Sequence, residues 1–165
     1  MSYLTAAQWD EFLAQRPEAH LLQTRSWGEV KSAFGWSPAW VTNGKAGAQI
    51  LFRRLPLGFT LAYVPKGPVG ADWAALWPEI DDLCRQQRAI FLKIEPDAWE
   101  PVDTKLASAF GGFTPSDPIQ PRRTVIVSLE GSEDDWLARM KQKTRYNIRL
   151  AARKDVKVQE SDDFD

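Results

Sequence analysis

The fold is decided by residues 36–64, WSPAWVTNGKAGAQILFRRLPLGFTLAYV, which read as three strands joined by two turns. Residues 36–42 alternate well enough for a half-buried strand. Asn43-Gly44 follows at once and is a strong hairpin signal, because both residues tolerate the positive φ of the tight turn. The rest of the stretch predicts a returning strand over residues 48–55, a turn at Leu57-Gly58 and a third strand over residues 59–64. We therefore expect an antiparallel meander.

Helices are expected on both sides of this meander. Thr5 and Gln8 have the spacing of a capping box, so a helix should run from there to about Gln15. A second helix over residues 27–34 would be capped by Thr24 or Ser26 and closed by Gly35. After the meander the pattern predicts helices over residues 71–88 and 102–110, strands over 89–94, 123–129 and 156–159, a helix capped near Ser132, and a basic helix.

This order of elements predicts an α+β (α/β three-layer) fold whose sheet is mixed, mainly antiparallel and covered by helices. The strand at residues 156–159 has no partner in the sequence, and an unpaired strand at a chain end is unusual for a complete domain. We therefore expect a first domain over residues 1–138, and over residues 139–165 a basic helix with the start of a truncated second domain.

Composition excludes several classes of protein. The chain has 165 residues, of which 44% are apolar and 26% charged, as in soluble globular domains. Cys84 is the single cysteine, which excludes an internal disulfide framework and a multi-cysteine metal site. The lone histidine, His20, has no local acidic partner, and no catalytic triad, Walker loop or metal-ligand cluster is visible. With no signal peptide and no apolar run of about 18–20 residues, we expect a cytoplasmic protein.

Positive charge is concentrated in residues 139–157, which contain eight lysines and arginines and one acidic residue, in a chain of net charge −1. Tyr146 lies among these cations. Two interpretations fit: a site for an anionic partner, and a solvated helix whose partners are acidic residues elsewhere. The i, i+4 spacing along the segment predicts a ridge on one helix face, formed by Lys141, Arg145, Arg149 and Arg153.

Two further features could bind a ligand. Trp27 and Lys31 are four residues apart on one predicted helix face, where they could stack and neutralise a ligand, or where the lysine stem could simply cover the indole. In the turn Pro65-Lys66-Gly67-Pro68, Lys66 could face an anion beside backbone amides. An ordinary rigid turn is the alternative there.

Five segments together resemble the Fem-type peptidyltransferases, the FemAB/FemX-like aminoacyltransferases of peptidoglycan bridges. The resemblance extends over nearly the whole chain in the right order. The segments are LQTRSWGEVK (22–31) followed by Gly35-Trp36, YVPKGP (63–68), LKIEP (92–96), QPRRT (120–124) and the basic stretch 140–150.

The resemblance implies two domains like those of GNAT acyltransferases and transfer of an amino acid from aminoacyl-tRNA to the stem-peptide amino group of a peptidoglycan precursor. The implied acceptor is UDP- or lipid-linked, the reaction uses no metal and no cofactor beyond the tRNA co-substrate, and the enzyme would associate peripherally with the inner face of the membrane. Members are roughly twice as long as this chain, so we expect the 165 residues alone to transfer poorly or not at all.

Carried onto this sequence, the resemblance implies that Trp27, Lys31, Lys66 and Gly67 bind the precursor, and that Lys141, Arg145, Tyr146 and Arg149 bind tRNA or a precursor phosphate. It names no catalytic residue. Two other functions stay open: a CoA-dependent N-acetyltransferase of the same fold, for which residues 53–58 are only a poor match to a pyrophosphate loop, and a non-catalytic nucleic-acid-binding or anion-binding module built on the basic helix.

Overall fold

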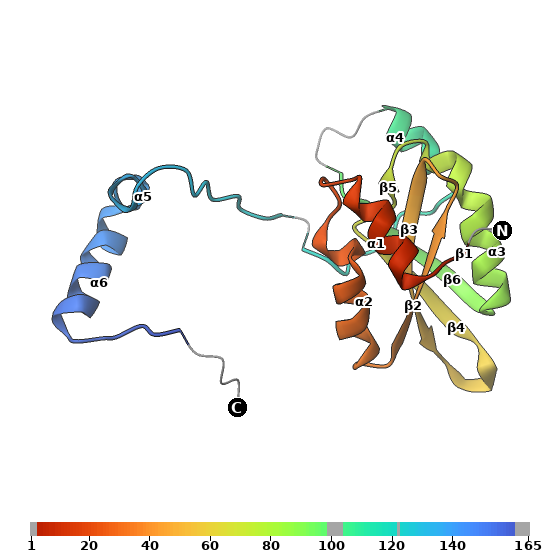
Figure 1. Cartoon of the computed structure of the whole chain (residues 1–165), viewed down its shortest axis with the longest axis horizontal. Coiled ribbons are helices and arrows are strands. Elements are labelled where there is room, and N and C mark those ends of the chain that lie inside the picture. The colour runs from red at the N-terminus through yellow and green to blue at the C-terminus, as the bar shows by residue number, and fades with distance from the viewer. Residues whose placement is uncertain (1–2, 99–103, 122, 161–165) are drawn as a thin grey trace. The chain divides into compact units, whose positions relative to one another are not determined.

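The computed structural model describes residues 3–98, 104–121 and 123–160, which fall into two compact units, 1–122 and 123–165. Each unit is described by itself. Unit 1 contains, in chain order, β1 (Tyr3–Leu4), α1 (Ala6–Ala14), η1 (Leu21–Gln23), α2 (Arg25–Ser32), β2 (Trp36–Thr42), β3 (Ala46–Arg54), η2 (Pro56–Gly58), β4 (Thr60–Pro65), β5 (Val69–Gly70), η3 (Trp73–Leu76), α3 (Trp77–Gln86), β6 (Ala89–Glu95) and α4 (Thr104–Ala109) (Figure 1).

The sheet of unit 1 is mixed, with strand order β1-β2-β3-β4-β6 and β5 paired to β3. The expected antiparallel meander is present as β2, β3 and β4. β4 and β6 run parallel, with Pro65 opposite Glu95, so both strands end on the same edge of the sheet. That arrangement brings the residues that follow β4 and β6 close together.

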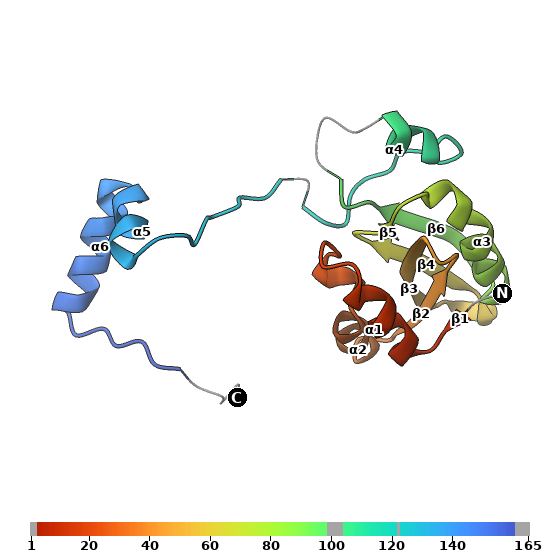
Figure 2. The same cartoon turned by 45° about the horizontal axis from the view of Figure 1, so that its top comes forward.

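Helices cover both faces of this sheet, as Figures 1 and 2 show, with α1 and α2 on one side and α3 and α4 on the other. The main apolar core lies under α3, whose Ile80, Leu83 and Cys84 are buried against alternate residues of the strands. On the opposite face, α1 buries Trp9 completely. A Cβ added to Gly47 in β3 would lie 2.9 Å from the rings of Phe12 and Trp9, so this helix packs directly on the strand backbone.

Strands β3 and β4 separate part-way along the sheet. Their pairing ends at Leu51 and Tyr63, after which β4 continues beside β6 and β3 continues towards β5. The backbone of β3 at Gln49 therefore has no strand on that side. A side chain from η1 fills the space, as described below.

Unit 2 contains two helices, α5 (Glu133–Arg139) and α6 (Gln142–Arg153). A capping box between Ser132 and Asp135 begins α5, and hydrogen bonding to Ser132 lowers the pKa of the Asp135 carboxyl. Lys141 is the N-cap of α6 and lies outside the helix proper.

Some expected elements differ in the structure. The predicted helix over residues 71–88 is a short η3 followed by α3, with Pro78 in the first turn of α3, where a missing N–H costs least. The strands expected at residues 123–129 and 156–159 are absent from the described part of the chain. Both segments have strand-forming side chains, but a strand also needs a hydrogen-bonding neighbour, and the described residues of unit 2 supply none.

Candidate functional site

The helix α2 carries Trp27 and Lys31, the first two residues that the sequence singled out. Thr24 begins the helix by accepting a hydrogen bond from the Trp27 backbone N–H at 3.3 Å. Gly28 permits close packing on the sheet, since a Cβ there would lie 2.5 Å from Gln49 Oε1 and 3.0 Å from Pro38. The position of Lys31 relative to β2 and β3 is therefore fixed by backbone packing.

Lys31 lies close to two aromatic rings. Its Nζ is 5.4 Å from the ring centroid of Trp27 and 5.8 Å from that of Trp36. The predicted proximity of Trp27 and Lys31 on one helix face is confirmed, and Trp36 was missed. The guanidinium of Arg53, opposite Trp36 in the β2–β3 pairing, lies 5.6 Å from the same Trp36 ring. Two cations thus contact one indole, which favours an electron-rich or anionic ligand beside it.

The Trp27 indole also has an unused donor. Its Nε1 is buried and has no hydrogen-bond partner among the residues that the structure describes. An unpaired buried donor costs roughly 1–3 kcal/mol. Because this atom is covered by protein, the ring of Trp27, and not its N–H, is the part of the residue that lies near Lys31 Nζ.

Next to Trp36 lies a polar cluster centred on Glu95 at the end of β6. Tyr63 and Trp36 have ring centroids 6.4 Å apart. The Tyr63 hydroxyl donates to Glu95 Oε2, and the backbone N–H groups of Ile119 and Gln120 donate to the same carboxylate. The Gln120 side-chain amide donates to the Tyr63 hydroxyl at 3.3 Å.

This cluster has an evident electrostatic character. Burial raises the pKa of the Tyr63 hydroxyl well above its ordinary value, and its hydrogen bond to Glu95 adds to the rise. Tyr63 therefore stays protonated and serves as a donor. Because Glu95 accepts from three residues, its present arrangement holds residues 119–120 against the sheet edge.

Gln23 fills the gap between β3 and β4 and was missed by the sequence analysis. Its side chain is fully buried. Its Oε1 accepts from the Gln49 backbone N–H at 2.8 Å, and its Nε2 donates to the carbonyls of Pro65 at 2.6 Å and Gln49 at 3.4 Å. The side-chain amide of Gln23 thus makes the hydrogen bonds to β3 that the backbone of a neighbouring strand would otherwise make. The chain from η1 into α2 is tied by this residue to the end of β4.

The turn after β4 is built differently from the sequence expectation. Lys66 has φ +49° and pairs with Asp97 at 3.4 Å. Gly67 is buried and donates its N–H to the Glu95 carbonyl at 3.3 Å. A Cβ there would lie 2.7 Å from the Gln23 amide, which explains the glycine. Of the backbone amides beside which Lys66 could face an anion, that of Gly67 is therefore already used within the protein, and Lys66 is partly neutralised by Asp97.

Contacts join these residues into one area of unit 1. Trp27, Lys31 and Trp36 are linked through Tyr63 to Glu95 by ring contacts and a hydrogen bond. The Lys66–Gly67 turn joins the same area through the Glu95 carbonyl and Gln23. The precursor-binding role of Trp27, Lys31, Lys66 and Gly67 itself stays a prediction.

The predicted basic ridge belongs to unit 2 and is only partly available to a ligand. Arg145 is half-buried and donates to the Ala138 carbonyl at 3.3 Å and to the Met140 carbonyl, so it caps the end of α5. The Arg153 guanidinium lies 6.0 Å from the Tyr146 ring. Lys141 and Arg149 are exposed. Binding of tRNA or phosphate by this helix stays a prediction.

The comparisons with known proteins agree with this geometry. The model of the FemAB family matches residues 4–105, which include Trp27, Lys31, Trp36, Tyr63 and Glu95. The chain belongs to the FemAB family. A lipid II:glycine glycyltransferase of Staphylococcus aureus is 29% identical over 182 residues, covering 97% of this chain and 43% of the relative. The crystal structure of FemX matches with a TM-score of 0.72 and 27% identity, over 92% of this chain and 44% of that one.

This FemAB family chain thus spans less than half the length of the relatives it matches. Within the part that the structure describes, no group of three or more His, Cys, Asp or Glu side chains is placed to hold a metal ion. None of the described helices is long and apolar enough to cross a membrane.

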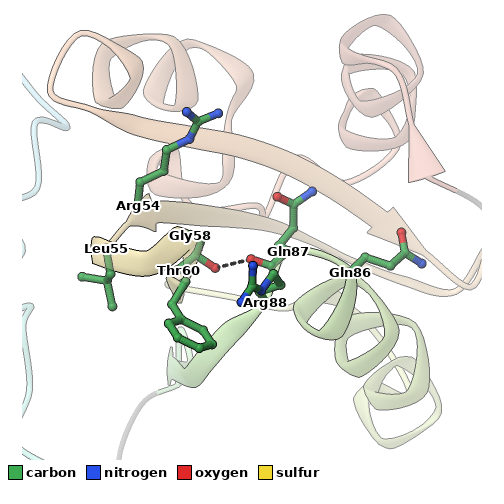
Figure 3. A pocket seen from close by; sticks show the side chains of 8 residues that line it. Arg54, Leu55, Gly58, Thr60, Gln86, Gln87 and Arg88 are labelled. Carbon is green, nitrogen blue, oxygen red and sulfur yellow. Dashed lines mark hydrogen bonds between the residues drawn. The ribbon is translucent and has the colours of Figure 1, made fainter.

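A separate shallow pocket of about 300 Å³ lies at the β3–β4 hairpin, beyond the Lys31 area. Figure 3 shows its lining residues, which are Arg54, Leu55, Gly58, Phe59, Thr60, Gln86, Gln87 and Arg88. Two of the lining residues are joined by a hydrogen bond, in which the Thr60 hydroxyl donates to the Gln87 carbonyl at 2.7 Å. The sequence had suggested this stretch only as a poor pyrophosphate loop.

Proposed function

We propose that this chain is the N-terminal part of an aminoacyltransferase that forms peptidoglycan bridges in the cytoplasm. The acceptor is the stem-peptide amino group of a UDP- or lipid-linked precursor, and the donor is aminoacyl-tRNA. The observation that carries the proposal is the Lys31 site, in a chain whose FemAB match covers it. The name of the S. aureus relative supports a lipid-linked precursor.

The fold is consistent with this chemistry. The antiparallel β2–β3–β4 meander, the parallel β4–β6 pair and the helices on both faces support a GNAT-like assignment of the first domain. In the transfer, the acceptor amine forms a bond to the ester carbonyl carbon, and the bond from that carbon to the tRNA ribose oxygen breaks. The proton lost by the amine ends on that ribose oxygen. Cations and amide N–H groups stabilise the oxyanion that develops.

In this proposal Lys31 binds a phosphate of the precursor beside the rings of Trp27 and Trp36. The buried Tyr63 packs against Trp36, and Glu95 keeps residues 119–120 in place. The two cations beside Trp36, Lys31 and Arg53, support a phosphate or pyrophosphate as the group bound there.

The test is calorimetric binding of a UDP-linked muropeptide to the 165-residue chain. Lys31→Ala should weaken binding about tenfold or more, because a hydrogen bond to a charged group contributes about 1.5–3 kcal/mol. Lys31→Arg should restore most of it. The matched control is Arg25→Ala, which removes a cation from the same helix that is already paired with Asp10 and Glu29. Equal losses in the Lys31 and Arg25 variants, or an undetectable wild-type interaction, would refute the site.

An anion-binding module remains as a second function for unit 2, because Lys141, Lys143 and Arg149 are exposed on or beside α6. In an aminoacyltransferase the natural polyanion would be the tRNA. The acetyltransferase alternative is weaker. Residues 53–58 end in the three-residue η2, whose Leu57 has non-helical φ +62°, so they do not open a helix that could hold a pyrophosphate.

A further inference from the structure

Three apolar side chains are exposed at one end of unit 1. Leu57 at the tip of the β3–β4 hairpin is 85% exposed, Phe34 after α2 is 69% exposed, and Phe59 is 37% exposed. They lie at the same end of the sheet because Trp36, two residues after Phe34, pairs with Arg53 at the base of the hairpin (Figure 1). Leu57 also has φ +62°, a conformation that leucine rarely adopts. Folding of unit 1 gains little from these side chains.

Three arginines flank the apolar residues. In the described part of the chain, Arg53, Arg54 and Arg88 have no carboxylate partner, whereas Arg25 has two, and Lys66 and Arg85 have one each. Arg53 lies on Trp36 and Arg88 on Phe59, at 5.6 and 4.8 Å from the ring centroids. Residues 53–59 contain no acidic side chain. We call Phe34, Arg53, Arg54, Leu57, Phe59 and Arg88 the hairpin-end surface.

We propose that the hairpin-end surface docks on an anionic lipid membrane. Exposed apolar tips flanked by unpaired cations match a lipid surface, where the apolar groups enter the acyl boundary and the guanidinium groups bind phosphates. A second copy of the chain would bring like charges together, and a nucleic acid would leave the apolar tips without apolar contacts. The charge and the exposure together therefore favour lipid.

The hairpin-end surface is close to the proposed precursor site. The ring centroid of Trp36 lies 5.6 Å from the guanidinium of Arg53, which belongs to the hairpin-end surface, and 5.8 Å from Nζ of Lys31, which belongs to the proposed precursor site. If the hairpin-end surface lies on the membrane, Arg53 is at the headgroup layer, and Lys31 contacts the same Trp36 ring as Arg53. Lys31 would then be close to the layer in which the phosphates of a lipid-linked substrate lie. This last step rests on the proposed function; docking itself does not.

The first experiment places a fluorophore at the hairpin tip. Leu57→Cys is labelled with nitrobenzoxadiazole, and Leu21→Cys, which is 65% exposed on η1, serves as the matched control. Native Cys84 is buried, and burial raises the pKa of its thiol to about 12, so labelling should be selective for the introduced cysteine. Vesicles of equal parts phosphatidylglycerol and phosphatidylcholine should shift the emission at position 57 to the blue and leave position 21 unchanged. Equal responses, or none, would overturn the proposal.

The second experiment measures vesicle sedimentation. Arg54→Gln with Arg88→Gln should weaken binding about thirtyfold, because each basic residue at an anionic surface contributes about a fivefold factor. The control Arg25→Gln with Arg85→Gln removes the same charge from paired positions and should have a much smaller effect. Equal binding to pure phosphatidylcholine would contradict the proposal.

The basic helix of unit 2 is the competing source of membrane binding. If Lys143→Gln with Arg149→Gln abolishes sedimentation while the hairpin variants bind normally, binding belongs to α6 and the proposal is wrong. These vesicles contain no peptidoglycan precursor, so the result is independent of whether the chain belongs to an aminoacyltransferase. Loss of muropeptide binding with intact vesicle binding would refute only the proposed function.

Discussion

Replacing Gln23 by leucine should destabilise unit 1 far more than the change in side-chain volume suggests. The wild-type amide accepts from the Gln49 N–H at 2.8 Å and donates to the Pro65 carbonyl at 2.6 Å, and the site is fully buried. In Gln23→Leu both backbone groups lose their partner. Each buried unsatisfied group costs about 1–3 kcal/mol, so the two together cost roughly 2–6 kcal/mol. That is a large part of a domain stability of about 5–15 kcal/mol.

The assay is urea unfolding followed by tryptophan fluorescence. With an m value of about 2 kcal/mol/M, in the middle of the usual range, the expected loss lowers the urea midpoint by roughly 1–3 M. Hydrogen exchange should locate the effect, with faster exchange at the Gln49 and Gly67 amides. Gln15→Leu, at an exposed helix end, is the matched control and should change the free energy of unfolding by about 0.5 kcal/mol or less.

The variant Gln23→Glu sharpens the test through pH. A protonated carboxyl can donate to the Pro65 carbonyl and accept from the Gln49 N–H, whereas a carboxylate would face the carbonyl oxygen without a donor. Burial should therefore raise the pKa of the introduced carboxyl in the folded state. The variant should be closest to wild type below pH of about 4.3, the ordinary glutamate value, and should lose stability as pH rises through the raised folded-state pKa. A loss independent of pH, or a Gln23→Leu protein as stable as the Gln15 control, would refute the account of Gln23.

Three further predictions follow from the contacts. Lys31→Ala should change the free energy of unfolding by no more than about 0.5 kcal/mol in urea melts, because its partners are ring faces beside solvent; a larger loss would make the residue structural. Lys143→Ala with Arg149→Ala should reduce the salt slope of tRNA binding by about 1 per residue, measured by filter binding, and an unchanged slope would exclude α6 as the contact. In wild type, the stability that the raised pKa of Tyr63 supplies is present below pH of about 10 and is lost as pH rises further; Tyr63→Phe should lack this decline in alkaline urea melts, and parallel alkaline profiles would contradict the raised pKa that burial and the Glu95 hydrogen bond give the hydroxyl.

The sequence predicted the meander well because its signals are local. Asn43 and Gly44 form the β2–β3 turn, with Gly44 at φ +87° and the Asn43 side chain accepting from the backbone N–H groups of Lys45 and Ala46 at 3.0 and 2.8 Å. The i, i+4 spacing likewise indicated that Trp27 and Lys31 meet on α2. Such patterns depend on residues a few positions apart, which a sequence displays directly.

The rest of the site depends on pairs far apart in the chain. Tyr63 meets Glu95, and Gln23 meets Gln49 and Pro65, only because β4 is parallel to β6 and leaves β3 after Tyr63. A glutamine in a short connector has no periodic signal that would mark it as buried. The expected strand at residues 123–129 failed for a related reason, since side-chain propensity does not supply a neighbouring strand.

The split between β3 and β4 explains why a glutamine, and not an apolar residue, lies at position 23. An apolar side chain could fill the same volume, but it would leave the Gln49 N–H and the Pro65 carbonyl unpaired. One amide offers a donor and an acceptor with the spacing of a peptide group, so it satisfies both and fixes the register of η1 against β3. The side-chain amide of Gln49 in turn donates to the carbonyls of the two residues that flank Gln23, Leu22 at 3.2 Å and Thr24 at 2.9 Å. Because α2 begins directly after Thr24, this exchange sets where Lys31 lies, eight residues beyond Gln23, relative to Trp36 and the turn after β4.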